Sequence, residues 1–389
     1  MIDLMYCSES NRWYQKSTYR YLYWGKDQKR LYPPPSSFST KRVIQIESAK
    51  NSIRPLVGII AGTNPFHHFS GNASIFKDIQ REITNHGGLS YVFTPGDVYR
   101  THIQGYLYDE DTKKWTGYHF PYPNVIYNRI PDREEELTNM VSSLFALFKQ
   151  KDIPFFNRSF FQKLDIFSYL SSHEYLTLHI PETIELTIEN LDPLLHKFPS
   201  VFCKPSSGSK GRGIFRVKKL PTGYQYEDHE MTRYFSSITA LHTHIAPFLH
   251  EKYLVQKEIQ LSTYNNHPYD FRIMLQKPLN YWTVTGIGIR VGFDNSLTTH
   301  VPRGGRIVAF HKLADEKDSL ILTKIAILAA EVIEEREDIK ECSMDIGKDT
   351  DGHFWIFEAN SKPMRFDEPA IHREYIQSLI STFRTFSAF

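Results

Sequence analysis

Cysteine is scarce in this chain of 389 residues. The three cysteines, Cys7, Cys203 and Cys342, lie far apart and show no CxxC spacing. This argues against a disulfide framework and against a structural zinc site. Cys203 and Cys342 lie in apolar, strand-like patterns, where we expect them to be core residues.

An excess of charge of one sign is also lacking. Lys and Arg number 46 against 44 Asp and Glu, which leaves a formal net charge of +2. Such a balance gives no global electrostatic attraction to nucleic acid or to an acidic membrane, so we expect neither as a partner. Specific phosphate contacts remain open.

Long apolar runs are absent as well. The longest apolar helix pattern, near Ile321–Ile333, is interrupted by Lys324 and Glu331. The first 17 residues lack a basic stretch followed by an apolar one. We therefore expect no membrane span and a product that is made and kept in the cytoplasm.

Aromatic residues, by contrast, are abundant. The chain has 27 Phe and 23 Tyr within a 41% hydrophobic composition, enough for the cores of two or three domains. Residues 1–53 predict only short strands, near Tyr19–Trp24 and Val43–Glu47. We assign that segment no chemistry.

A βαβ pattern begins after Arg54. The apolar runs Leu56–Ala61 and Leu89–Phe93 flank an amphipathic helix pattern at Ala73–His86, which predicts an α/β unit. A hairpin around residues 109–112, a strand at Val125–Asn128 and a helix at Glu134–Lys149 follow.

Arg129 directly follows the predicted strand Val125–Asn128. Ligands of open α/β sheets bind beyond the carboxyl ends of the strands, so Arg129 could hold a substrate carboxylate through its planar guanidinium. An ion pair with nearby Asp132 or Glu135 is an equally good interpretation.

An acidic hairpin is the most informative stretch. The Asp351-Gly352 pair predicts a tight turn, and the segments Ser343–Gly347 and Phe354–Glu358 predict antiparallel strands on either side of it. This register places Asp345 opposite Glu358.

Alternation along the second strand then puts Glu358 and Asn360 on one side and Phe357 on the other. Two carboxylates and an amide are ligands that Mg²⁺ accepts when it accompanies a nucleotide. The alternative is a solvated acidic end of a hairpin.

A glycine-rich loop, Pro205–Gly213, separates strand patterns at Val201–Lys204 and Ile214–Val217. Glycine lets backbone N–H groups approach phosphate oxygens, and Lys204 would add a fixed charge. The loop does not match GxxxxGK[ST], and a strand follows it, so a Walker-type site is not expected. A flexible turn is the alternative.

Further candidates follow in order along the chain. A strand pattern at Tyr253–Ile259 precedes Asp270–Leu275, which carries Arg272, and the loop His300–Ile307 carries Arg303. Arg272 could instead pair with Asp270 or Glu258, and Arg303 could be a surface charge.

Taken together, these motifs resemble the ATP-grasp superfamily. The resemblance rests on Lys163, Lys204 with SSGSKGRG, VQKEI, DFR, RGG, and Asp345 followed by FEANSKP. The phrases VIYNRIPDR, VPRGGRI and EANSKP are closest to the YheC/YheD family of endospore-coat-associated proteins. The resemblance implies an α+β ATP-grasp fold over residues 159–389. It is preceded by a small α/β pre-ATP-grasp domain over residues 54–158 and by the β-rich segment 1–53.

The resemblance also implies roles for single residues, with ATP and Mg²⁺ as cofactors. Lys163 and Lys204 would contact the phosphates, and Arg272 would neutralise charge on the transferred phosphoryl group. Arg303 would bind substrate or phosphate. The remaining implied contacts are a phosphate-covering flap (Ser207, Gly208, Ser209, Gly211, Gly213), the adenine-contacting backbone (Gln256, Lys257, Glu258, Ile259) and Mg²⁺ ligands (Asp345, Glu358, Asn360). Gln162 and Glu258 depart from the usual pattern.

The implied reaction is ATP- and Mg²⁺-dependent ligation of a carboxylate to an amine through an acyl phosphate, in a protein associated with sporulation or the spore coat. Other coat proteins would be partners, and the mother-cell cytoplasm or the spore coat would be its location. Two alternatives stay open: a non-catalytic nucleotide-binding component of the coat, and a kinase that uses the same ATP site.

Overall fold

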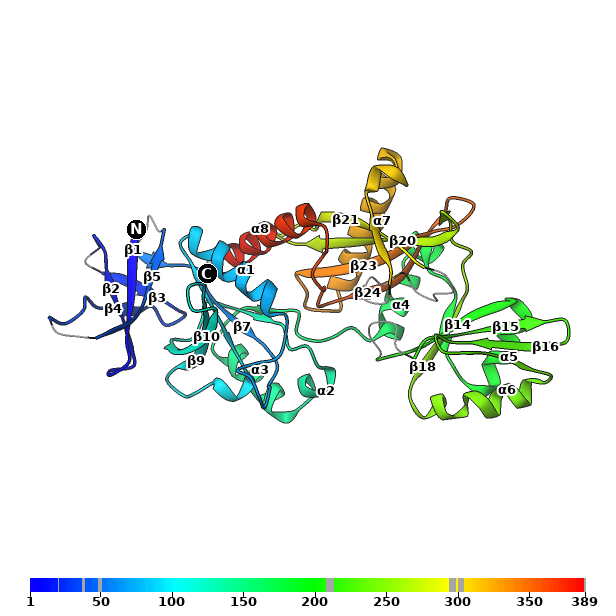
Figure 1. Ribbon diagram of the computed structural model, residues 1–389, viewed down its shortest axis with the longest axis horizontal. Coiled ribbons are helices and arrows are strands. Elements are labelled where there is room, and N and C mark those ends of the chain that lie inside the picture. The colour runs from blue at the N-terminus through cyan, green and yellow to red at the C-terminus, as the bar shows by residue number, and fades with distance from the viewer. Residues whose placement is uncertain are drawn as a thin grey trace.

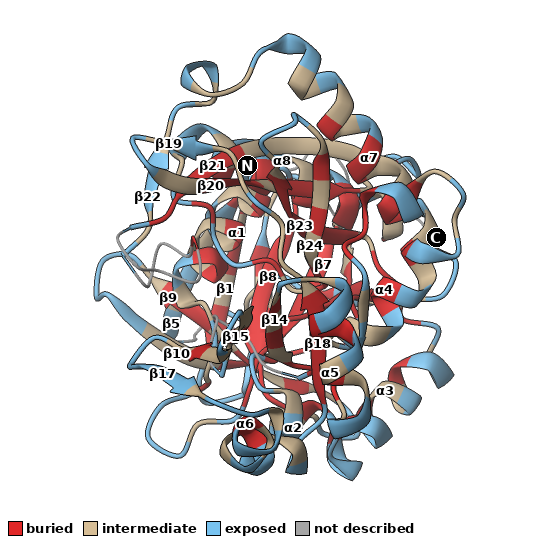
Figure 2. Ribbon diagram, turned by 90° about the vertical axis from the view of Figure 1, so that its right-hand side faces the viewer, coloured by how far each residue is buried: buried red, intermediate tan, exposed pale blue. Residues whose placement is uncertain are grey.

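The computed structural model describes residues 1–19, 21–36, 39–47, 51–207, 213–293, 299 and 304–387. Its lobes follow one another along a long axis, with the N-terminal strands at one end and the sheet that contains β14–β18 at the other (Figure 1). Buried residues concentrate in the central strands of the sheets, while the outer faces of the helices are exposed (Figure 2).

The N-terminal part is all β. One three-stranded sheet has the order β2-β1-β5 and a second has the order β4-β3-β6. Trp13 and Trp24 lie against Phe120 of the next lobe, at ring-centroid distances of 5.5 and 6.0 Å. The strands are β1 (Ile2–Cys7), β2 (Arg12–Lys16), β3 (Leu22–Trp24), β4 (Lys29–Leu31), β5 (Thr40–Ile46) and β6 (Ser52–Ile53).

The second lobe contains the predicted βαβ unit. Strands β7 and β8 are parallel and joined through α1, and β9 and β10 form the predicted hairpin. The sheet order is β10-β9-β8-β7-β11-β12. The elements are β7 (Leu56–Ile60), α1 (Ala73–Asn85), β8 (Leu89–Phe93), β9 (Ile103–Asp109), β10 (Lys114–Phe120), β11 (Val125–Asn128) and β12 (Phe155–Phe156).

The predicted helix Glu134–Lys149 is two helices, α2 (Arg133–Glu136) and α3 (Asn139–Gln150). The single-helix prediction is wrong because the hydroxyl of Thr138 accepts a hydrogen bond from the N–H of Val141 and caps a new helix. The break leaves Arg133 as the first residue of the short helix α2.

The third lobe is an antiparallel sheet in the order β13-β18-β14-β15-β16-β17. Leucines of α5 and the residues Leu241 and Ile245 of α6 pack against Val201, Cys203 and Val217 of the sheet. The elements, with the helix α4 that precedes them, are α4 (Lys163–Ser171), β13 (Thr183–Glu185), α5 (Ile188–Lys197), β14 (Ser200–Pro205), β15 (Phe215–Leu220), β16 (Gly223–Glu227), β17 (Thr232–Phe235), α6 (Ile238–Ile245) and β18 (Tyr253–Lys257).

The fourth sheet has the order β22-β21-β20-β23-β24, with β19 beside β20. Phe271, Ile273 and Leu275 share one core with α7, whereas Asp270 and Arg272 alternate with them and belong to the opposite face. The elements are β19 (Thr263–Tyr264), β20 (His267–Gln276), β21 (Thr283–Val291), β22 (Arg306–Val308), α7 (Glu316–Glu334), β23 (Glu341–Lys348), β24 (Phe354–Asn360) and α8 (Pro369–Phe386).

Helix α8 ties the fourth sheet to the second lobe. Leu379 and Phe383 of α8 share a core with Met274 of β20 and with Ile75 and Ile79 of α1. The end of β11 contacts the loop that follows β24, because Nη2 of Arg129 donates to the carbonyl of Pro363.

Candidate nucleotide and metal site

The acidic hairpin forms in the predicted register. Asp345 of β23 lies opposite Glu358 of β24, and Gly352 takes the positive φ of 87° that the turn requires. Carboxylates on directly opposed residues of an antiparallel pair lie on the same face, at neighbouring positions. Two negative charges are thus held side by side.

The prediction for Phe357 is wrong. The register shifts after the Asp345–Glu358 pair, so that Ile346 pairs with Ile356 and Phe357 is the extra residue of a bulge. Simple alternation fails at such a bulge. The ring of Phe357 lies 5.8 Å from Nζ of Lys204, on the site side of the strand.

Arg290 anchors the inner carboxylate. Its Nη2 lies 3.0 Å from Oδ2 of Asp345, and its Nε and Nη2 donate to Asp270 at 3.0 and 2.8 Å. Burial opposes the charge of Arg290, but Asp270 and Asp345 raise its pKa. Sequence reasoning missed this residue; the only signal was its position in a strand that alternates with small and apolar residues.

Two lysines from separate elements approach the carboxylates. Lys163, the first residue of α4, places Nζ 3.6 Å from Oε1 of Glu358 and 3.4 Å from the carbonyl oxygen of Pro205. Lys204 of β14 donates to Oε1 of Gln256 at 2.7 Å. Burial and then the charge of Lys163 lower the pKa of Lys204 to about 8, against the opposing effect of Glu358.

Arg272 of β20 lies on the same face of the fourth sheet as Asp345, which we call the charged face. It lies opposite Asp345 in the register of β20 and β23. Its Nη2 donates to the carbonyl oxygen of Met364 at 3.1 Å, and its guanidinium lies 4.7 Å from the ring centroid of Phe366. Burial lowers the pKa of Arg272, and Asp345 raises it. The alternative partners considered from sequence, Asp270 and Glu258, are bound by other arginines.

The third-lobe strand β18 contributes Gln256. Its side chain is buried and bridges Lys204 to Thr183, because Nε2 donates to Oγ1 of Thr183 at 2.8 Å. The amide thus fixes the lysine without neutralising its charge. Sequence reasoning considered only the backbone of Gln256.

The backbone that follows is partly engaged. The N–H of Lys257 donates to the carbonyl of Glu182 at 2.9 Å, and the N–H of Glu258 donates to Ser200 at 3.2 Å. The carboxylate of Glu258 accepts from Nη1 of Arg216 at 2.9 Å. Adenine contact at Gln256–Ile259 stays a prediction.

The predicted flap is described only at its ends. Ser207 is exposed after β14, and Gly213 has a φ of 70°, with Tyr253 Oη only 2.7 Å from where a Cβ would lie. Both features favour glycine at position 213. Gly208, Ser209 and Gly211 lie outside the described residues, as does Arg303.

The donor set fits Mg²⁺ bound together with phosphate. In the described part of the chain, no three His, Cys, Asp or Glu side chains are grouped so as to hold a metal ion by themselves. Asp345, Glu358 and Asn360, the predicted ligands, carry hard oxygen atoms on two adjacent strands, and Asn360 lies opposite Ser343. Mg²⁺ characteristically takes one or two carboxylates and completes its shell with phosphate oxygens and water.

Arg129 is not part of this charged face. Its guanidinium is buried, donates to the carbonyl of Pro363 at 2.7 Å and lies 3.2 Å from Oε1 of Glu341 and from Oη of Tyr127. The ion-pair partner is thus Glu341 rather than Asp132 or Glu135. Because protein groups already occupy the guanidinium, its predicted contact with a substrate carboxylate is not supported.

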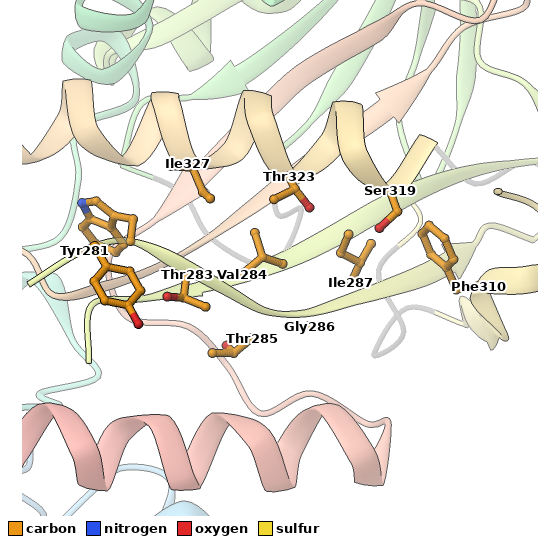
Figure 3. A pocket seen from close by; sticks show the side chains of 11 residues that line it. Tyr281, Thr283, Val284, Thr285, Gly286, Ile287, Phe310, Ser319, Thr323 and Ile327 are labelled. Carbon is orange, nitrogen blue, oxygen red and sulfur yellow. The ribbon is translucent and has the colours of Figure 1, made fainter. Parts of the chain in front are cut away.

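A separate hollow of about 560 Å³ lies between β21 and α7. Val284 and Ile287 of the strand face Thr323 and Ile327 of the helix across it (Figure 3). All its lining residues are uncharged, and none belongs to the predicted site.

Comparison with known proteins gives a consistent picture. The family described as YheC/D like ATP-grasp matches residues 152–388. The endospore coat-associated protein YheD of Bacillus subtilis is 29% identical over 82% of this chain and 75% of its own length. YheC of the same organism is 24% identical over 72% of this chain and 82% of its own length.

Solved structures support the fold. The VanG D-Ala:D-Ser ligase of Enterococcus faecalis covers 85% of this chain and 99% of its own, with a TM-score of 0.53 and 11% identity. D-alanyl-alanine synthetase A of Vibrio cholerae covers 86% and 99%, with a TM-score of 0.52 and 10% identity. None of the helices in the described ranges is long and apolar enough to cross a membrane. The chain belongs to the YheC/D-like ATP-grasp family.

Proposed function

We propose that the chain is an ATP- and Mg²⁺-dependent ligase that activates a carboxylate as an acyl phosphate and joins it to an amine. One observation carries the proposal: Lys163 and Lys204, from different elements, converge on the Asp345–Glu358 pair. A purely structural descendant has no physical need for such a concentration of like and unlike charges.

Each group has a separate task in this proposal. Lys163 and Lys204 bind the phosphates of ATP, and Arg272 neutralises charge that develops on the transferred phosphoryl group. Asp345, Glu358 and Asn360 hold Mg²⁺, which screens the charge between neighbouring phosphates. Arg290 holds the carboxylate of Asp345 in position, because it pairs with that carboxylate at 3.0 Å.

Proteins of similar fold favour the ligase reaction over the alternatives. The solved structures of matching fold include a D-Ala:D-Ser ligase and a D-alanyl-alanine synthetase. The sequence relatives are named as endospore coat-associated proteins, so we place the enzyme in spore formation, with coat proteins as its partners. A kinase would use the same ATP site, and the product of the reaction separates the two.

The first experiment is a calorimetric titration with Mg²⁺ and a non-hydrolysable ATP analogue. The native protein should bind the analogue only when Mg²⁺ is present. Glu358→Gln removes one of two metal carboxylates and should weaken binding at least tenfold, about 1.4 kcal/mol. Absence of nucleotide binding by the native protein would refute the proposal.

Glu334→Gln is the matched control. Glu334 is also partly buried and accepts from Lys277 at 2.6 Å, but it lies at the far end of α7. The Glu334→Gln variant should have the nucleotide affinity of the native protein. ADP formation with pools of amino acids, peptides and cell-wall precursors then tests catalysis, and a phosphorylated rather than a ligated product would identify a kinase.

A further inference from the structure

Arg133 of the second lobe lies beside the proposed nucleotide site. It is the first residue of α2, and its Nη1 donates to the carbonyl of Phe161 at 3.0 Å. Its guanidinium lies 4.7 Å from the ring centroid of Phe160. Lys163, only two residues after Phe161, contacts Glu358. The second lobe thus places a cation next to the segment that carries a phosphate-binding lysine.

Within the described ranges, Arg133 differs from its cationic neighbours in lacking an ion pair. Arg129 pairs with Glu341, Arg158 pairs with Asp338, and Lys362 pairs with Glu136. Arg133 forms no ion pair with any residue that the structure describes. Burial lowers its pKa, and Glu358 and then Glu136 raise it. The guanidinium is therefore half-buried, positively charged and close to the metal carboxylates.

Such a group is a binding site for an anion. A partly desolvated guanidinium without a partner carries a cost that a ligand anion offsets. Its planar fork matches the two oxygens of a carboxylate, whereas the nucleotide phosphates already have two lysines in the proposed site. The only hydrogen bond of Arg133 in the described structure uses a single N–H, so other donors stay available.

We infer that Arg133 binds a carboxylate of the substrate on the second-lobe side of the metal pair. It takes the task that the sequence suggested for Arg129, four residues earlier. This inference rests on the proposed function and names the residue that would hold the carboxylate of its substrate. No step of the inference requires a further cofactor.

The test uses the whole chain saturated with Mg²⁺ and the non-hydrolysable ATP analogue. Acetate, succinate, L-glutamate and D-alanine are titrated in turn, at ionic strength held constant with sodium chloride, and Tm is followed by differential scanning fluorimetry. At least one carboxylate should raise Tm of the native complex. Arg133→Met should shift the midpoint of that titration at least tenfold, and Arg133→Lys should recover part of the affinity.

Arg158→Met is the matched control, because Arg158 also stacks on a phenylalanine, at 4.6 Å from the ring of Phe155, but is paired with Asp338. It should keep the native carboxylate response. The inference is overturned if no carboxylate raises Tm of the native complex, or if Arg133→Met responds like the native protein. If the nucleotide itself gives no shift, the proposed function falls as well, which distinguishes the two failures.

Discussion

Strand β23 carries an acidic side chain at each of two positions four residues apart, and their surroundings differ. Glu341 is fully buried, accepts from Oη of Tyr127 at 2.5 Å and pairs with Arg129 at 3.2 Å. Asp345 is 5% exposed and pairs with Arg290, and its neighbours on β24 and α4 are Glu358 and Lys163. We name these the closed cluster (Tyr127, Arg129, Glu341) and the open cluster (Lys163, Lys204, Asp345, Glu358).

The comparison distinguishes charged residues that join parts of the fold from charged residues that we propose to bind a ligand. In the closed cluster, Tyr127 and Arg129 of the second lobe both contact Oε1 of Glu341 and so join that lobe to β23. In the open cluster, Lys163 stays 3.6 Å from Glu358, and Lys204 is bonded to the neutral amide of Gln256. Both lysines are thus held in place while their charge remains available to an anion, which is what a phosphate site requires.

The largest effect is expected from a substitution that breaks the closed cluster. Arg129→Met leaves Glu341 buried without its counter-ion, and removing one partner of a buried pair costs about 3–5 kcal/mol. We expect a loss of that size in the free energy of unfolding, measured by urea titration. Burial already raises the pKa of Glu341, with Arg129 and Tyr127 opposing that rise, so the unpaired carboxyl should take up a proton.

The matched control is Arg133→Met, since Arg133 has no ion pair among the described residues and should lose about 1 kcal/mol or less. Arg129→Met combined with Glu341→Gln should recover part of the loss, because no charge then stays buried. A cost below about 1 kcal/mol for Arg129→Met alone would contradict the assignment of Arg129 to the closed cluster.

A smaller effect is expected in the open cluster, and on affinity rather than stability. Lys163→Met removes a charged donor to phosphate, worth about 1.5–3 kcal/mol, so affinity for the Mg²⁺-bound ATP analogue should fall roughly 10- to 100-fold. The free energy of unfolding should change by about 1 kcal/mol or less, because the contact with Glu358 is long. Calorimetry and urea titration give the two numbers.

Lys277→Met provides the opposite pattern. Lys277 donates to Glu334 at 2.6 Å, away from the open cluster, so stability should fall while affinity stays unchanged. Equal losses of affinity in both variants would mean that Lys163 acts only through the fold, and the distinction between the clusters would not hold.

Local patterns predicted much of the fold. The βαβ unit at Leu56–Phe93, the hairpin that pairs Asp345 with Glu358, and strand β14 are set by alternation, turn residues and helix periodicity, which act over a few residues. The split at Thr138 was missed because a cap depends on one hydroxyl inside an otherwise helical pattern.

Contacts between lobes could not be predicted in the same way. Arg129 finds Glu341 more than two hundred residues away, and Arg290 finds Asp345 across β20. Nothing near Arg129 or Arg290 in the sequence specifies those partners. The bulge at Phe357 is likewise set by the pairing of two strands rather than by either alone.

The smallest expected effect concerns pH, and it compares one lysine of the open cluster with a lysine outside it. Burial is the main reason that the pKa values of Lys204 and Lys362 are both lowered to about 8. In the unfolded chain a lysine has a pKa of about 10.4, so the unfolded state binds the proton of each lysine more tightly than the folded state does. The contribution of each lysine to the free energy of unfolding therefore rises between about pH 8 and 10.4. For Lys204, the pH dependence of nucleotide affinity has the opposite sign. Affinity falls as pH rises, because phosphate favours the protonated form of the lysine.

Affinity for the Mg²⁺-bound ATP analogue should therefore be full below about pH 8 and fall above it, by at most about tenfold per pH unit. Lys204→Met should lower affinity and abolish this slope. Lys362→Met should keep the slope, because Lys362 is held by Glu136 and the carbonyl of Ile130 rather than by the ligand. Calorimetric titrations from pH 7 to pH 9.5 measure the slope. If the slope disappears in Lys362→Met and not in Lys204→Met, then Lys362 rather than Lys204 is the lysine whose charge binds the nucleotide.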